Sequence, residues 1–148
     1  MKRMRILAVL FPALAAGACD PPLYAHVEPG SRADSLVFHA FKDDSVADAD
    51  EIYGIRVTGR GDSTGIPIYW EVERRARRFY PPREPRTHFR YGELPASDWI
   101  EPTWPVILRP GCYEAEVTGG GLSAYARYVV RADGRVLNID PQSRGSCP

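Results

Sequence analysis

The densest group of charged side chains in the sequence is a cluster of arginines near its middle. It contains Arg74, Arg75, Arg77 and Arg78, and Arg83, Arg86 and Arg90 follow it. A guanidinium group binds two phosphate oxygens at once, so this cluster predicts contact with anionic lipid, lipopolysaccharide or another anionic polymer. The alternative is a solvated loop whose arginines pair with nearby glutamates, namely Glu71, Glu73 and Glu84.

An acidic group precedes the arginines and raises the question of a metal site. It contains Asp43, Asp44, Asp48, Asp50 and Glu51. Carboxylate oxygens are ligands for calcium, but the spacing differs from that of an EF-hand loop, because Ile52 occupies the next alternate position and Gly54 falls one residue late. The pattern favours a hydrated acidic loop. We expect no metal and no other cofactor.

The three histidines, His26, His39 and His88, are far apart in the sequence. No HExxH or GxSxG motif accompanies them, so neither a zinc protease nor a serine hydrolase is indicated. We therefore assign no catalytic residue. A site assembled only in space stays open, and the pair that an enzyme hypothesis would bring together is His88 and Glu93.

Two further patterns have both a structural and a binding interpretation. Residues 60–63 spell Arg-Gly-Asp-Ser, the sequence that integrin ligands display on a hairpin tip, but a turn between strands also requires Gly-Asp-Ser, and we favour the turn. Aromatic rings in the proline-rich middle either stack on sugar or protein, or pack in the core, which we favour for most of them. These rings belong to Phe79, Tyr80, Tyr91, Trp99 and Trp104.

The first eighteen residues have the three parts of a secretory signal peptide. Basic residues lie within 1–5, residues 6–16 are apolar apart from Pro12, and residues 16–18 are small. The apolar part is shorter than the roughly 20 residues that span a bilayer. We expect residues 1–18 to be removed and the mature chain to be exported.

Cys19 directly follows the small residues. The segment LAAGAC, which ends at Cys19, resembles a bacterial lipobox, although Ala16 stands where that family usually has leucine. The resemblance implies that Cys19 carries lipid and anchors the chain to the periplasmic side of a bacterial envelope. Asp20 resembles the signal that retains lipoproteins at the inner membrane, but the choice of membrane stays open. The alternative is ordinary cleavage, which would leave a free thiol at the new amino terminus.

The composition indicates one exported domain. The chain has 148 residues, with 19 Lys+Arg and 19 Asp+Glu, and loss of the basic signal residues leaves the remainder slightly acidic. Such a charge gives no general attraction to nucleic acid, so we expect no nucleic-acid partner. The remaining length is typical of one domain. We divide it into a proline-containing tether over 19–33 and a domain over 34–148.

If Cys19 carries lipid, Cys112 and Cys147 are the two cysteines left. An even pair in an oxidising compartment indicates a disulfide. It would close a loop of roughly 35 residues and contribute about 3–4 kcal/mol through the unfolded state. The alternatives are two separate thiols, or a metal site, which the absence of CxxC or histidine-rich spacing disfavours.

Several short segments alternate apolar and polar residues, which predicts antiparallel strands. The segments are 34–41, 52–58, 66–73, 87–91, 113–118, 123–130 and 135–139, with turns at 59–65, 119–121 and 132–134. Ile68, Trp70 and Val72 are expected to face the same side. Residues 74–86 and 95–105 are expected to be irregular. Six to eight strands without a helical period predict an all-β fold, an antiparallel sandwich.

Residues 108–117 (LRPGCYEAEV) carry a second resemblance. The segment looks like the L-x-P-G-x-x-Y-x-V-x-V turn and strand of fibronectin type III and related immunoglobulin-like domains, with the tyrosine one position early. The resemblance implies an immunoglobulin-like sandwich in which the hydroxyl of Tyr113 bonds back to the preceding turn and Trp70 lies in the core. The chain is also similar to small bacterial lipoproteins that carry one such domain. Such a fold does not specify an activity.

From these features we expect a lipid-anchored β-sandwich of the cell envelope that acts as a non-enzymatic binding or accessory module. Its partner would be a protein or an anionic envelope polymer. The alternative is an envelope enzyme that acts on glycan or lipid. A third interpretation makes the arginine cluster a contact with the membrane surface.

Overall fold

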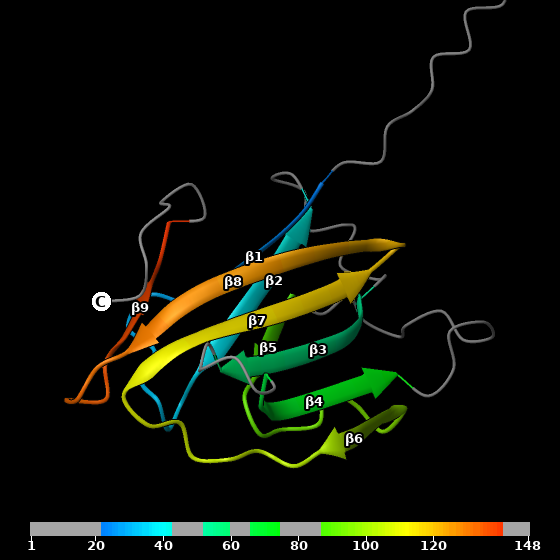
Figure 1. The fold of residues 1–148 in the computed structure, drawn as a ribbon. Coiled ribbons are helices and arrows are strands. Elements are labelled where there is room, and N and C mark those ends of the chain that lie inside the picture. The colour runs from blue at the N-terminus through cyan, green and yellow to red at the C-terminus, as the bar shows by residue number, and fades with distance from the viewer. Residues whose placement is uncertain (1–21, 43–51, 60–65, 75–86, 141–148) are drawn as a thin grey trace, which may run out of the picture.

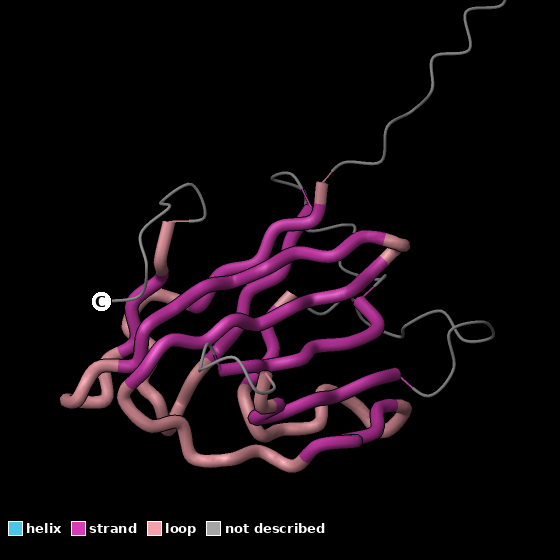
Figure 2. Tube along the Cα trace, in the orientation of Figure 1, coloured by secondary structure: helices cyan, strands magenta, loops and turns pink. Residues whose placement is uncertain are grey.

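The computed structural model describes residues 22–42, 52–59, 66–74 and 87–140. These residues form nine strands in two antiparallel sheets, and no helix occurs among them (Figures 1 and 2). The predicted all-β sandwich is confirmed, with more strands than expected. Within the same ranges, no helix is long and apolar enough to cross a membrane.

The larger sheet has six strands in the order β6-β4-β3-β7-β8-β9. They are β3 (Ile52–Gly59), β4 (Ile68–Arg74), β6 (Trp99–Thr103), β7 (Gly111–Gly119), β8 (Leu122–Val130) and β9 (Val136–Asn138). Strands β7, β8 and β9 pair in succession and correspond to the strands predicted over 113–118, 123–130 and 135–139. Gly120 and Gly121 turn the chain between β7 and β8 with φ of 54° and 78°, which glycine adopts without strain.

The smaller sheet has three strands in the order β1-β2-β5. They are β1 (Leu23–Val27), β2 (Val37–Lys42) and β5 (His88–Arg90). In the view of Figure 1, β2 crosses β7 and β8 at a steep angle. The predicted strands over 34–41 and 87–91 are therefore confirmed over 37–41 and 88–90.

Strand β1 corrects the prediction of a tether over 19–33. All five of its residues pair with β2, from Leu23 opposite Lys42 to Val27 opposite Phe38. The ends of the strand, Leu23 and Val27, are buried. The tether prediction is wrong over these residues because pairing with a distant strand orders a segment that looks aperiodic between prolines. The domain thus begins by Leu23 and not at residue 34.

Strand β6 corrects the prediction of irregular structure over 95–105. It lies at the edge of the larger sheet and pairs with β4, with Glu71 opposite Thr103 and Arg74 opposite Trp99. Pro102 made the segment look irregular, but an edge strand tolerates proline because only one of its sides takes part in the sheet.

Strand β4 contains an irregularity that the sequence did not reveal. Val57 on β3 pairs with Trp70 and the next residue, Thr58, pairs with Ile68, so Tyr69 is the extra residue of a β-bulge. The bulge breaks the alternation, and Ile68 is 41% exposed although Trp70 and Val72 are fully buried. The expectation that Ile68 shares their inward face is therefore wrong.

The core lies between the two sheets. Phe38 of β2 contacts Trp70 of β4 and Tyr128 of β8, with ring centroids 6.5 Å and 5.9 Å apart, and all three side chains are fully buried. The core position predicted for Trp70 is confirmed. Its indole Nε1 donates a hydrogen bond of 2.8 Å to Oε1 of Glu101, so the buried polar atom has a partner.

The tyrosine at the start of β7 makes the predicted turn contact. The Tyr113 hydroxyl donates to the backbone oxygen of Arg109 at 2.8 Å and accepts from its backbone nitrogen at 3.1 Å. These two bonds fix the entry of the chain into β7.

The side chain of Asn138 joins the two sheets at the edge of β1. Its Nδ2 donates to the backbone oxygen of Val27 at 2.7 Å, and its Oδ1 accepts from the Val27 nitrogen at 2.8 Å. One amide side chain thereby occupies the hydrogen-bonding positions that a neighbouring strand would use. A backbone bond of 2.9 Å from Ala33 to Gly134 continues this junction.

Candidate functional site

The pairing of β1, β2 and β5 brings all three histidines of the chain into one row. His26 lies opposite His39, and His39 lies opposite His88. The adjacent residues Val27, Phe38 and Phe89 are buried, and successive side chains on a strand point to opposite faces. The histidines therefore occupy the outer face of the small sheet.

Two further rings extend this row toward the start of β1. Tyr24 lies opposite Phe41, and their rings stack with centroids 5.4 Å apart and an interplanar angle of 23°. The Phe41 ring also contacts those of His26 and His39, at 5.5 Å and 5.0 Å. We call this surface, formed by Tyr24, His26, His39, Phe41 and His88, the histidine face.

The imidazoles on this face lie close enough to influence one another. The rings of His39 and His88 stack with centroids 4.4 Å apart and planes 10° apart, and His26 meets His39 edge-on at 5.0 Å. Burial lowers the pKa of His39, and the neighbouring His88 and His26 lower it further, against a smaller opposing effect of Glu28. The centre of the row therefore disfavours the protonated form.

His88 also belongs to a short chain of hydrogen bonds. Its Nε2 lies 2.8 Å from Oε1 of Glu28, and its Nδ1 lies 2.6 Å from Oγ1 of Thr87. A neutral imidazole satisfies both contacts by donating to the carboxylate and accepting from the hydroxyl. This arrangement fixes the ring orientation at the end of the row.

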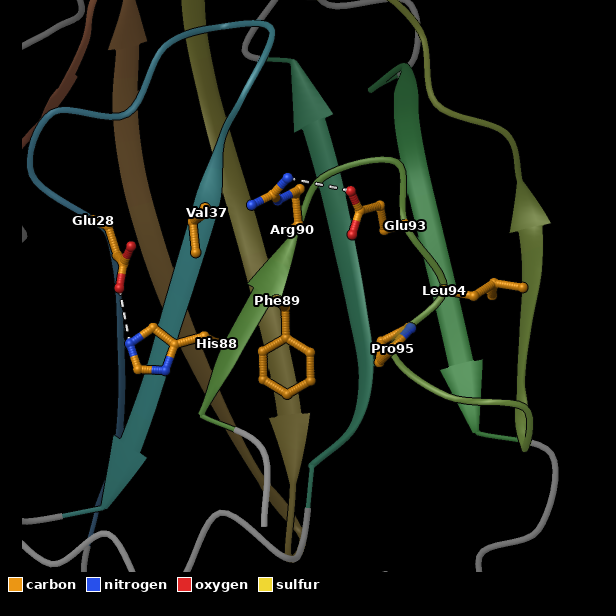
Figure 3. Close-up of a pocket in the computed structure, with 8 residues that line it drawn as sticks. All are labelled: Glu28, Val37, His88, Phe89, Arg90, Glu93, Leu94 and Pro95. Atoms are coloured by element: carbon orange, nitrogen blue, oxygen red, sulfur yellow. Dashed lines mark ion pairs between the residues drawn. The ribbon is translucent and has the colours of Figure 1, made fainter. Parts of the chain in front are cut away.

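An open pocket of about 360 Å³ adjoins His88 (Figure 3). It is lined by Glu28, Val37, His88, Phe89, Arg90, Glu93, Leu94 and Pro95. His88 points toward Glu28 on one side, and Arg90 pairs with Glu93 at 3.5 Å on the other. The structure thus brings His88 and Glu93 to one pocket, as the enzyme hypothesis required, and gives each a different side-chain partner.

The described residues contain no group of three histidine, cysteine or acidic side chains arranged to hold a metal ion. The geometry of the row explains this, because the rings of His39 and His88 are nearly parallel and stacked. Metal ligands must instead direct their donor atoms at a common point. The acidic residues Asp43, Asp44, Asp48, Asp50 and Glu51 lie outside the described residues.

The first residue of the arginine cluster does not fit an anionic surface contact. The Nε of Arg74 lies 2.7 Å from Oδ2 of Asp98, and its side chain is only 8% exposed. This arginine stabilises the end of β4 against the β6 side of the sheet, which corrects its assignment. Arg75, Arg77 and Arg78 lie outside the described residues, as does the Arg-Gly-Asp-Ser segment.

One glutamate of the alternative interpretation also has another partner. The Nε of Arg56 donates to Oε1 of Glu71 at 2.8 Å across β3 and β4. Glu71 thus pairs with Arg56 within the sheet, and its predicted pairing with Arg75, Arg77 or Arg78 concerns residues outside the described ranges.

The aromatic residues of the middle segment divide into two groups. Trp99 is buried against Phe89, with centroids 6.0 Å apart, and Tyr91 contacts Trp70. Trp104 is 78% exposed. Packing is therefore confirmed for Trp99 and Tyr91 and not for Trp104. Phe79 and Tyr80 lie outside the described residues.

Tyr91 has a specific hydrogen-bonding role. Its hydroxyl hydrogen is shared between the backbone oxygens of Val106 and Tyr69, at 2.7 Å and 3.0 Å, which binds the segment after β6 to β4. Burial raises the pKa of this hydroxyl to about 12.

Among the cysteines, only Cys112 lies within the described residues. It is disulfide-bonded. Its predicted partner Cys147 and the predicted lipidation site Cys19 lie outside those residues, so the pairing and the lipidation stay predictions.

Sequence reasoning missed the histidine face because it assigned His26 to a tether. The alternation that places Val37, His39 and Phe41 on one side of β2 was visible. The same signal exists in Leu23–Val27 (LYAHV), where Tyr24 and His26 alternate with inward apolar residues. The pairing registers of β1 with β2 and of β2 with β5 then align the three histidines.

Searches for related proteins add no assignment. No match to the chain was found among protein-family models, curated proteins or solved structures.

Proposed function

We propose that the chain is a lipid-anchored, non-enzymatic binding module of the bacterial cell envelope, attached through Cys19 and binding an envelope component through the histidine face. The observation that carries this proposal is the gathering of five rings from three strands on the outer side of the small sheet. The predicted signal peptide and the lipobox-like segment support the location.

The rings on this face exceed what the fold requires. The same strands supply the core from their inner side, where Phe38, Phe89 and Val27 are buried. The solvent side of an antiparallel sheet is usually polar. Tyr24 is instead 47% exposed beside Phe41. Rings with a polar edge supply contact area and hydrogen bonds with few rotatable bonds, which suits a binding surface.

An enzyme is the second candidate, and one observation favours it. Thr87, His88 and Glu28 form a hydroxyl–imidazole–carboxylate chain next to the pocket. Catalysis by such a chain depends on a water-excluded site, where charge stabilisation is strong. The side chains of His88 and Glu28 are 53% and 37% exposed, which favours binding over catalysis.

The binding proposal is tested with a secreted form, in which residues 1–18 are replaced by an ordinary secretory signal and Cys19 by alanine. We expect the native chain to gain a lipid-sized mass at Cys19. We expect the secreted form to remain partly on washed envelopes, because the histidine face still binds. Adding Tyr24→Ser and Phe41→Ser should release it.

The matched control is Tyr125→Ser, because Tyr125 is 49% exposed on β8, much like Tyr24, but lies on the larger sheet. It should leave envelope retention unchanged. Complete release of the secreted form without further substitutions would refute binding by the face. A native chain without added lipid mass would refute the anchor.

The enzyme candidate is tested with p-nitrophenyl acetate as an ester probe. Hydrolysis above the buffer rate that is lost in both Thr87→Val and His88→Gln would replace the binding proposal with the enzyme candidate. Equal rates of ester hydrolysis in the native chain and both variants would rule out the enzyme candidate.

A further inference from the structure

We infer that the histidine face binds an anionic phospholipid surface, and that this contact strengthens as the pH falls. The inference rests on the proposed function, because lipid at Cys19 is what would hold the face beside a bilayer. It adds that the envelope component bound by the face is a lipid bilayer and that pH controls this contact.

The length of chain between the anchor and the domain supports a bilayer as the occupant. Only Asp20, Pro21 and Pro22 separate Cys19 from Leu23, the first residue of β1. At about 3.5 Å per extended residue, this connection reaches at most about 14 Å. A nine-residue strand such as β7 spans about 30 Å, so the anchor holds the β1 end of the sandwich close to the lipid.

The order of side chains on the face fits this orientation. Tyr24 and Phe41 lie at the end of the sheet where β1 begins, nearest to the anchor. The three histidines follow, and Glu28 lies beyond them at the far end of β1. Tyrosine is enriched at the headgroup level of membranes because its ring is apolar and its hydroxyl is polar.

The charges that face the histidine row make the contact dependent on pH. Glu28 follows β1, Arg90 ends β5, and Glu93 lies in the loop after β5. With neutral imidazoles, the two carboxylates outnumber the single guanidinium. With protonated imidazoles, the cations outnumber the carboxylates, and the net charge of the face changes from negative to positive.

Linkage between protonation and binding gives the direction of the effect. An anionic surface favours the protonated imidazoles, so binding takes up protons and becomes stronger at lower pH. In the free domain, burial and the two flanking imidazoles lower the pKa of His39. The lowered pKa of His39 disfavours its charged form near neutral pH, and the face gains positive charge on acidification.

The test uses the mature chain with Cys19→Ala and sedimentation with vesicles of equal phosphatidylglycerol and phosphatidylcholine, or of phosphatidylcholine alone. One cation near an anionic surface contributes roughly fivefold, so we expect binding to the anionic vesicles to rise at least about tenfold between about pH 7.5 and about pH 5. Replacing His26, His39 and His88 with glutamine should remove this rise. His26→Arg should increase binding at the higher pH.

Three results would overturn the inference. They are no binding to anionic vesicles at the lower pH, equal binding to both vesicle types, and an unchanged rise in the triple glutamine variant. Circular dichroism of each variant verifies that it is folded. If the secreted form stays on envelopes through Tyr24 and Phe41 but does not bind the vesicles, this inference fails and the proposed function stands. If envelope retention is also absent, both fail.

Discussion

Tyr113 and Tyr128 lie opposite each other on β7 and β8, with ring centroids 5.7 Å apart and planes 20° apart. The Tyr113 hydroxyl exchanges two hydrogen bonds with Arg109, whereas the buried Tyr128 hydroxyl has no hydrogen-bond partner within the described part of the chain. Burial raises the pKa of both hydroxyls, and that of Tyr128 well above its usual range. The two residues share their packing and differ in hydrogen bonding.

Tyr128→Phe should leave the free energy of unfolding unchanged or raise it by about 1 kcal/mol. The substitution keeps the ring contacts with Phe38 and Tyr113 and removes a buried hydroxyl whose desolvation is uncompensated. Urea unfolding measures the change. A loss above about 1 kcal/mol would mean that the hydroxyl has a bonding partner.

Tyr113→Phe should lower the free energy of unfolding by about 1–3 kcal/mol. The ring stays, but the backbone nitrogen and oxygen of Arg109 lose the hydroxyl that bonds to both. The same urea experiment compares it directly with Tyr128→Phe. An equal effect of the two substitutions would show that the contact at Arg109 adds no stability.

The raised pKa of Tyr91 predicts a loss of stability at alkaline pH. Its pKa is raised to about 12, so between its unfolded pKa near 10 and about 12 the folded state holds a proton that the unfolded state has released. Stability therefore falls as pH rises through this interval. Tyr91→Phe should unfold more readily at neutral pH and show a shallower alkaline decline. Thermal unfolding at several pH values would measure both effects. Identical alkaline declines in stability for the native chain and Tyr91→Phe would exclude Tyr91 as a contributor.

The lowered pKa of His39 predicts a loss of stability as the pH falls below the ordinary histidine value. Its folded pKa is lowered, so the unfolded chain binds more protons as pH falls through the ordinary histidine value near 6.5. Its stabilising contribution is therefore full above that value and decreases below it. The difference in unfolding free energy between the native chain and His39→Gln should narrow on acidification from about pH 7.5 to about pH 5. A constant difference would contradict the lowered pKa.

Asp98→Ala tests the ion pair that removes Arg74 from the proposed anionic surface. The Arg74 side chain is 8% exposed, so loss of the carboxylate leaves a charge nearly out of water, and we expect a loss of about 1–3 kcal/mol. Glu93→Ala is the matched control. Its pair with Arg90 has both side chains about 60% exposed and should contribute about 0–1 kcal/mol. Similar losses in both variants would contradict this assignment.

The sequence was most informative where neighbouring strands follow one another. In β7, the alternation of Tyr113, Ala115 and Val117 with glutamates matches the burial pattern, and β8 follows through a tight glycine turn. Local periodicity suffices there because the partner strand is adjacent in the chain. The core position of Trp70 was predictable for the same reason.

Features set by distant pairing were not predictable from local pattern. β1 needs β2 to order it, the bulge at Tyr69 reverses the exposure of Ile68, and the partner of Arg74 lies 24 residues away in the chain. The candidate site depends on two registers of this kind, β1 with β2 and β2 with β5, since each histidine comes from a different strand. Sequence spacing alone holds no information about that alignment.

The amide of Asn138 gives the domain a mechanical asymmetry. An anchor at Cys19 would transmit tension to Leu23, the end of β1 that pairs with β2 and packs in the core, whereas the Val27 end is also clamped by the Asn138 side chain. A pull from the membrane would load the strand first at its weaker end and reach the clamp last. Peeling that began at Leu23 would therefore be arrested at Val27, and the strand would return to its register once the tension was released.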